Sequence, residues 1–215
     1  MRRLYGILAG AICLCMFGWT ARSFAQAPGD VVPGQYLVEL KRGVIPEVVI
    51  ARHGLGVKYI YKRIANGLAV SVPPGRLRAL QNDAEVLSIT PDRVMTAFAK
   101  PGGGSAIPPQ VVPAGVQRIG AAPGTLTVNG TGVGVAIVDT GLDFNQEDLI
   151  PLGVQSFSAY GGAAQDDNAH GTHVGGIVAA RNNAVDVVGV APAATLFAVK
   201  VLDRNGSGYL SDVIE

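Results

Sequence analysis

The chain has 215 residues, enough for one large domain or two small ones, and 48% of them are apolar against 15% charged. This composition excludes a chain that is disordered throughout, because it supplies enough apolar side chains for a sizeable core. The formal net charge of +1 gives no reason to expect a nucleic acid or an anionic membrane as partner.

Residues 1–25 have the pattern of a secretory signal peptide. Two arginines precede the apolar run LYGILAGAICLCMFGW, and small residues around Ala25 offer a cleavage site. The alternative is an uncleaved membrane anchor, for which the run is short. The signal pattern predicts a secreted protein, extracellular or periplasmic, with no membrane contact after cleavage. Both cysteines lie in this segment, so we expect no disulfide in the exported protein.

Residues 35–99 alternate between strand and helix patterns, and Gly/Pro-rich linkers are expected at 26–34 and 100–109. Strands are expected in QYLVEL, VKYIYKRI, GLAVSV and VLSITPD, the last ending before Pro91. Helices are expected in VVIARHG and PPGRLRALQNDAEV. The order strand, helix, strand, strand, helix, strand predicts a small α+β domain of ferredoxin-like plan.

The two parts on either side of the second linker carry opposite charge. Residues 36–99 hold nine Lys and Arg against five Asp and Glu, a net of +4, and residues 110–215 hold four against ten, a net of −6. Opposite signs favour docking of one part on the other. Solvated faces with no mutual role are the alternative, and the charges alone do not separate the two.

Residues 110–215 have the pattern of a doubly wound parallel α/β sheet. The apolar run GVGVAIVDTGLD (132–143) suits a central strand that is covered on both faces. It places Asp139 at the carboxyl end of the strand, where open α/β sheets bind ligands; the alternative is a plain helix-capping aspartate. A helix in HGTHVGGIVAAR and a buried strand in ATLFAVKVLD follow.

The stretch DDNAHGTHVGGIVAA (166–180) allows three interpretations. His170 and His173 lie three residues apart on one helix face, which is weak evidence for zinc because no third ligand is evident. The spacing of Asp166 and Asp167 supports no metal motif. An ordinary helix start is the second interpretation. The third is general-base catalysis by a histidine whose tautomer a buried carboxylate, such as Asp139, would fix.

VAIVDTGLD and HGTHVGGIVAA together resemble the aspartate and histidine motifs of the subtilisin-like serine proteases, in the same order and 31 residues apart. VVGVAPAATLFAVKVLDRNGSG and QVVPAGVQRIGA extend this resemblance, and residues 35–99 resemble the inhibitor-type propeptide of the family. The resemblance implies a secreted zymogen of a serine endopeptidase that acts on proteins and peptides. It also implies an intramolecular propeptide at 35–99, a maturation site in the 100–109 linker and a peptidase part at 110–215.

The resemblance also implies roles for individual residues. Asp139 corresponds to the triad aspartate, His170 to the general base and later acid, and His173 to a structural histidine. Gly206, Ser207 and Gly208 correspond to the strand that pairs with the substrate backbone, which implies broad specificity. A calcium site is implied, although ordinary surface polar residues are the alternative. Its ligands would be side-chain oxygens of Gln110, Asp148 and Asn183 and carbonyl oxygens of Arg181, Val185 and Val187.

The nucleophile of the family is not found in this sequence. No motif like GTSMA follows His170, and Ser207 and Ser211 stand in other contexts. We therefore expect the N-terminal half of a longer protease, with an incomplete sheet, inactive and prone to aggregation by itself. The alternatives are a non-catalytic propeptide-like inhibitor or binding module with a degenerate peptidase remnant, and a metal hydrolase that uses the two histidines.

Overall fold

The computed structural model describes residues 27–63, 65–97, 109–149 and 156–215. The signal peptide expected at 1–25 and nearly all of the linker expected at 100–109 lie outside the described residues. None of the helices in the described ranges is long and apolar enough to cross a membrane.

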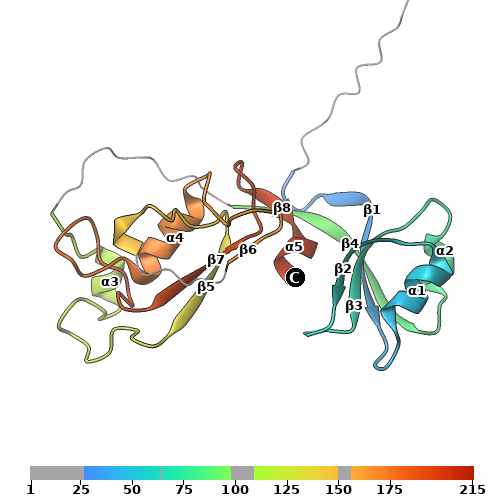
Figure 1. Cartoon of the computed structure of the whole chain (residues 1–215), viewed down its shortest axis with the longest axis horizontal. Coiled ribbons are helices and arrows are strands. Elements are labelled where there is room, and N and C mark those ends of the chain that lie inside the picture. Colours follow the sequence, from blue (N-terminus) through green and yellow to red (C-terminus); the bar gives the residue numbers. More distant parts are fainter. Residues whose placement is uncertain (1–26, 64, 98–108, 150–155) are drawn as a thin grey trace, which may run out of the picture.

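The N-terminal part is an antiparallel sheet that two helices cover on one side (Figure 1). Its elements are β1 (Val31–Leu40), α1 (Pro46–His53), β2 (Gly56–Tyr61), β3 (Gly67–Ser71), α2 (Leu77–Gln81) and β4 (Val86–Thr96). The strands pair in the order β2-β3-β1-β4. Alternate residues such as Val38, Leu68 and Val70 point toward the helices and form a core with Val49 and Leu80.

The first and last strands of this part in chain order, β1 and β4, extend past the proline and glycine signals that were expected to end them. β1 begins at Val31, inside the expected 26–34 linker, and β4 continues through Pro91 to Thr96. The register shifts between Val31, which pairs with Arg93, and Tyr36, which pairs with Pro91. A proline that lacks an N–H is tolerated at such an irregularity, so Pro91 does not end the strand. The second helix is also shorter than the expected 73–86 segment.

The C-terminal part contains a parallel sheet in the order β5-β7-β6. Its elements are α3 (Ala114–Arg118), β5 (Gly134–Asp139), the 3-10 helix η1 (Glu147–Leu149), β6 (Phe157–Ser158), α4 (His170–Ala179), β7 (Thr195–Lys200), β8 (Ser207–Tyr209) and α5 (Leu210–Ile214). Helix α4 packs against the sheet over a core that includes Ile137, Leu142 and Leu196. The parallel sheet is compatible with the expected α/β class.

One expectation about this sheet is not met within the described residues. The strand β5 was expected to be central and covered on both faces, but β7 is the middle strand of the described sheet. Val138 of β5 is 47% exposed, because α4 covers only the opposite face of the strand. An apolar run of this kind indicates a buried strand, but it does not fix the order of the strands.

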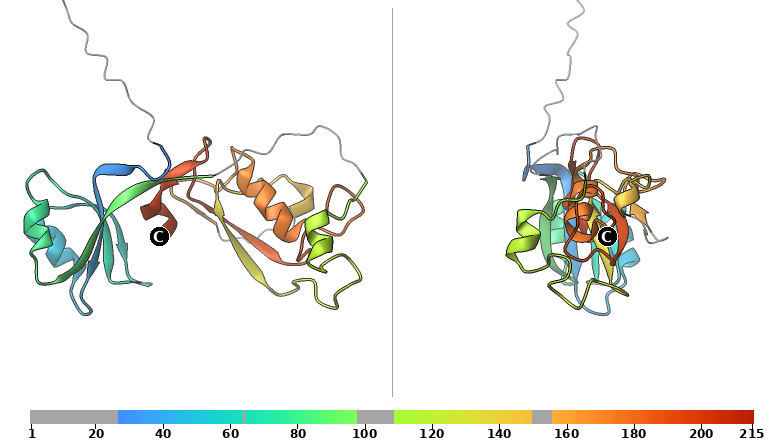
Figure 2. Two further views of the ribbon diagram at one scale, coloured as in Figure 1. Left: turned by 180° about the vertical axis from the view of Figure 1, so that it is seen from behind. Right: turned by 90° about the vertical axis from the view of Figure 1, so that its left-hand side faces the viewer.

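The two parts meet at β8 and α5, which lie between them when seen from the front (Figure 1) and from behind (Figure 2, left). β8 pairs antiparallel with β4, Met95 opposite Gly208, so the N-terminal sheet continues into the C-terminal part. Helix α5 packs against β4. The contact joins segments that are more than a hundred residues apart in the sequence.

Candidate active site

The end of β5 and the start of α4 bring Asp139 and His170 together. Nδ1 of His170 lies 2.8 Å from both carboxylate oxygens of Asp139. Asp139 is 8% exposed and also accepts the backbone N–H of Thr140 at 2.6 Å. No group in the described ranges hydrogen-bonds to Nε2 of His170. A carboxylate on one ring nitrogen and a free second nitrogen make an imidazole that can accept and return a proton.

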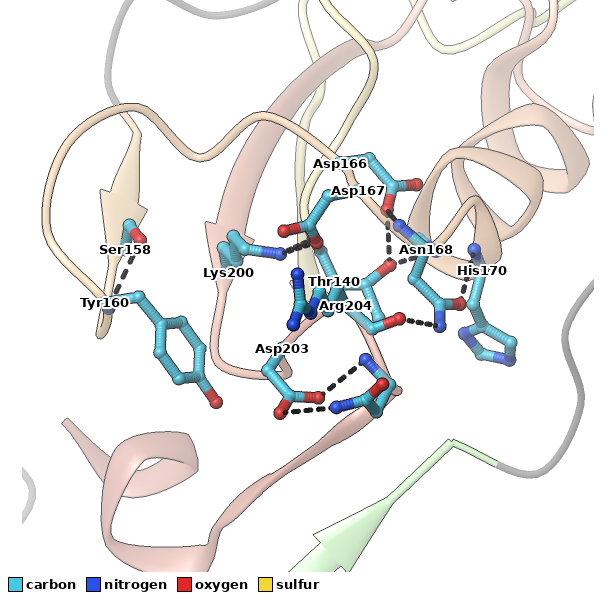
Figure 3. A network of polar contacts seen from close by, with 12 residues as sticks. Thr140, Ser158, Tyr160, Asp166, Asp167, Asn168, His170, Lys200, Asp203 and Arg204 are labelled. Carbon is cyan, nitrogen blue, oxygen red and sulfur yellow. Dashed lines mark hydrogen bonds and ion pairs between the residues drawn. The ribbon is translucent and has the colours of Figure 1, made fainter.

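Asp166 joins the strand end to the helix start, a role that the sequence did not indicate (Figure 3). Its Oδ1 accepts hydrogen bonds from the Thr140 hydroxyl and from the N–H groups of Asn168 and Ala169. Its Oδ2 accepts the N–H and the hydroxyl of Thr172. Ala169 has a φ of 82°, which costs free energy in a residue with a Cβ, so these bonds hold a strained turn directly before His170.

The balance of burial and hydrogen bonding at Asp166 favours the carboxylate. Burial opposes ionisation, but the bonds from Thr172, Asn168 and Thr140 outweigh it, and the pKa of the Asp166 carboxyl lies below its usual value. The sequence signal that could have found this residue is an acidic side chain a few positions before a helix start, where it can accept free N–H groups.

Lys200 is a second residue whose role at this site was missed. It pairs with Asp139 across the parallel sheet and is 5% exposed. Its ammonium donates to the Thr140 carbonyl at 2.5 Å and to Asp167 at 2.6 Å (Figure 3). Asp167 thus compensates a buried positive charge, which would be costly without a partner. In the sequence Lys200 is one polar residue in an apolar strand, so only its neighbours in space reveal this role.

Helix α4 approaches β5 too closely for any side chain at Gly171. A Cβ at this position would lie less than 3.0 Å from the carbonyl oxygen of Gly141 and 3.2 Å from Cβ of Asp139. The N–H of Gly171 also donates to the Thr140 hydroxyl at 2.9 Å. The glycine after His170 therefore sets the short distance between the helix and the strand that ends at Asp139.

Of the predicted substrate-pairing residues, Ser207 and Gly208 lie on β8, and Gly206 directly precedes the strand. Gly206 accepts the N–H of Ala97 at 2.7 Å, and Gly208 pairs with Met95, so the end of β4 already lies along this strand. Asn168 connects strand and histidine, since its Nδ2 donates to the carbonyl of Arg204 and its Oδ1 accepts the N–H of His170 (Figure 3).

The six residues expected to bind calcium lie close together in the structure. The amide of Gln110 donates to the carbonyls of Arg181 at 2.7 Å and Val187 at 3.4 Å. Residues 109 and 185 form a β-bridge, which brings Val185 to the same place. The amide of Asn183 donates to Asp148 at 2.9 Å.

Asp148 lies in this cluster as a buried carboxyl, 5% exposed. Burial raises the pKa of Asp148, and nearby Asp186 adds to this effect, while the hydrogen bond from Asn183 opposes it. Carbonyl, amide and carboxylate oxygens are the donors that calcium prefers, so the composition of the cluster fits this ion.

The described ranges contain no cluster of three His, Cys, Asp or Glu that could hold a metal. His173 is exposed on α4, and the part of the chain that the structure describes offers no third ligand of these types to His170 and His173.

Residues 130–215 match the model of the subtilase family. An alkaline protease of Shouchella clausii is 40% identical over 149 residues, which cover 69% of this chain and 36% of that protein. Subtilisin E of Bacillus subtilis (strain 168) is 36% identical over 168 residues, 77% of this chain and 41% of the relative. A thermostable alkaline protease of Halalkalibacterium halodurans is 51% identical over 86 residues, 40% of this chain and 24% of that protein. The chain thus spans less than half the length of these relatives.

Proposed function

We propose that this chain works in a secreted zymogen that hydrolyses peptide bonds in proteins. The chain belongs to the subtilase family through residues 130–215, and it is by resemblance a serine-type endopeptidase. The observation that carries the proposal is the 2.8 Å contact between His170 and Asp139. Residues 1–215 hold no serine in a Gly-Thr-Ser context, so we propose that this segment supplies two members of the triad and is inactive alone.

The chemistry of the pair follows from its geometry. Asp139 holds the proton on Nδ1 of His170 and stabilises the imidazolium that forms when Nε2 takes a proton from a serine hydroxyl. Nε2 then returns this proton to the leaving amine when the peptide bond breaks. Asp166 and Lys200 contact Thr140 rather than a reacting atom, so they act as positioning residues for the pair.

We assign residues 35–99 to an inhibitor-type propeptide of ferredoxin-like plan, after a signal peptide at 1–25 and a linker at 26–34. The strand order β2-β3-β1-β4 supports this plan. The pairing of β4 with β8 supports the inhibitory role, because β4 takes the edge that a substrate backbone would use. The maturation site would lie in the 100–109 linker, and the peptidase part would be 110–215.

The contact of this domain with α5 supports an intramolecular partner. Asp92 accepts the N–H of Ser211 at 3.1 Å and its hydroxyl at 2.6 Å. Tyr61 donates to the Ser211 carbonyl, and Lys58 pairs with Asp212 at 2.6 Å. Lys58 belongs to the N-terminal part, whose net charge is positive, and Asp212 belongs to the C-terminal part, whose net charge is negative. The ion pair therefore favours the docking interpretation of the opposite charges, although hydrogen bonds make most of this contact.

We also propose that calcium binds at the cluster of Gln110, Asp148, Arg181, Asn183, Val185 and Val187. The buried carboxyl of Asp148 supports this, because a cation would offset the cost of its ionisation. When bound, calcium would supply structural crosslinking between the segments around residues 110, 148 and 185. It would take no part in the chemical step.

The experiment that tests the proposed function is expression of the gene product together with any sequence encoded beyond codon 215. The wild-type protein should be secreted and cut within the 100–109 linker. His170→Ala should be secreted and remain uncut, whereas the matched His173→Ala, on the exposed side of the same helix, should be processed. Normal self-processing of His170→Ala would contradict the proposal. A stop directly after codon 215 and a wild-type protein that is never cut would instead favour a non-catalytic inhibitor.

A further inference from the structure

The strand β8 is one arm of a hairpin whose other arm is bound to Asp139. The N–H groups of Val201 and Leu202 donate to the carbonyl of Asp139 at 2.9 and 3.1 Å. The chain then turns and returns as β8. The two arms are in close contact, because a Cβ at Gly208 would overlap the carbonyl oxygen of Val201. The position of β8 relative to Asp139 thus depends on what holds this hairpin closed.

The two edges of β8 have different partners. The carbonyl of Gly206 and the pairing at Gly208 face β4. Backbone groups alternate between the edges of a strand, so those of Ser207 face the hairpin. The N–H of Ser207 donates to Asp203 Oδ1 at 2.9 Å, and its carbonyl accepts the N–H of Asp203 at 2.7 Å. The edge of β8 that faces the hairpin, which we call the rear edge, therefore carries the bonds that hold the strand in place.

Tyr160 reaches this rear edge from the loop after β6 (Figure 3). Its hydroxyl lies 3.1 Å from the carbonyl oxygen of Ser207 and 3.2 Å from that of Val201, so its single hydrogen is shared between the two arms. The N–H of Ala159 donates to the carbonyl of Lys200, which fixes the loop. Tyr160 is 47% exposed, but partial desolvation of its hydroxyl raises the pKa of Tyr160, with Asp203 as the next cause, so the hydroxyl keeps its hydrogen.

We infer that Tyr160 is a positioning residue that holds β8 at a fixed distance from Asp139 and thereby sets how an extended peptide lies against the pair Asp139–His170. This inference rests on the proposed function for its consequence in catalysis. Its structural basis, the bridge between Val201 and Ser207, stands without that function. Loss of the hydroxyl would leave the ring in place and free β8 to move away from the arm bound to Asp139.

Hydrogen exchange in the 215-residue chain tests the bridge without any need for catalysis. In Tyr160→Phe, the amides of residues 206–209 should exchange about 3- to 10-fold faster than in the wild type, as expected for one lost hydrogen bond. The matched control is Tyr209→Phe, which removes a hydroxyl from β8 itself that makes no hydrogen bond in the described residues. Equal exchange in the wild type and Tyr160→Phe would overturn the inference.

Kinetics of the proteolytically active gene product test the consequence. Tyr160→Phe should raise KM for a tetrapeptide amide about 3- to 10-fold, with kcat within about 2-fold of wild type. Hydrolysis of a single-residue ester, too short to lie along β8, should not change. Unchanged KM for the tetrapeptide would overturn the positioning role. If the wild-type protein hydrolyses neither substrate, the proposed function fails, and the exchange experiment alone decides the role of Tyr160.

Discussion

Replacing Gly171 by alanine should separate His170 from Asp139. The new Cβ would lie less than 3.0 Å from the carbonyl oxygen of Gly141, a backbone atom that cannot rotate away. Relief requires α4 to move outward by about 1 Å, given ordinary contact distances. His170 begins this helix, and a shift of that size would stretch its 2.8 Å contact with Asp139 beyond hydrogen-bonding distance.

The magnitude follows from three contributions. Overpacking costs about 1 to 3 kcal/mol in a well-packed contact. The N–H of Gly171 loses the Thr140 hydroxyl, and an unsatisfied buried donor costs about 1 to 3 kcal/mol. Alanine recovers about 1 kcal/mol of helix propensity relative to glycine. The free energy of unfolding should therefore fall by about 3 kcal/mol.

Gly176 in the same helix is the matched control, because a Cβ at that position meets nothing within 4 Å. Gly176→Ala should raise the free energy of unfolding by about 0.5 to 1 kcal/mol. Thermal unfolding followed by circular dichroism should show Tm about 6 to 12 °C lower for Gly171→Ala and slightly higher for Gly176→Ala. The proton NMR signal of the His170 Nδ1–H should persist only in the second variant. Equal Tm values for the two variants would refute the reasoning.

Four further predictions concern three carboxylates, those of Asp166, Asp148 and Asp92. Asp166→Asn should lower the free energy of unfolding by about 2 to 3 kcal/mol, because the amide cannot accept at both oxygen positions, whereas Asp186→Asn should change it by less than about 0.5 kcal/mol in urea unfolding. The folded-state pKa of Asp166 is lowered, so its ionised carboxylate adds to the free energy of unfolding above about pH 4. This stabilisation is lost as pH falls through the folded pKa. The stability of the wild type should therefore drop more steeply than that of Asp166→Asn between about pH 4 and 2. Calcium at about 100 times its Kd should add about 2.7 kcal/mol to the stability, and this gain should vanish in Asp148→Asn; an equal gain in that variant would place the ion elsewhere. Asp92→Asn should accelerate amide exchange in α5 about 10-fold, since Ser211 loses a carboxylate partner, and unchanged exchange would argue against docking through this contact.

The positions of Asp139 at a strand end and of His170 at a helix start could be predicted from the sequence, because the signals for these two elements are local. The apolar run ends at Asp139, and the helix pattern begins at His170, so each motif fixes its own element. The distance between them then follows from placing a helix start beside a strand end. Asp166 and Lys200 could not be assigned in this way, because their roles depend on Thr140, which is distant from both in the sequence.

The strand ends were predicted less well for a related reason. Proline and glycine are local signals, and they predicted ends before Pro91 and after Gly34. In the structure, pairing of Val31 with Arg93 and of β4 with β8 keeps both strands extended past these residues. Partners that are distant in the sequence outweighed the local preference of the backbone.

The strand β8 has only one edge that a further strand can use, because Asp203 and Tyr160 hold the other. That edge is taken by β4 of the same chain, whose effective concentration as a tethered segment is on the order of millimolar. A free peptide that pairs with β8 as well as β4 does would have to reach millimolar concentration to displace β4 from half of the molecules. Cutting the chain between Ala97 and Pro109 would replace this local concentration by the bulk one, so the pairing of β8 would respond to the loss of the tether far more than to the abundance of free peptides.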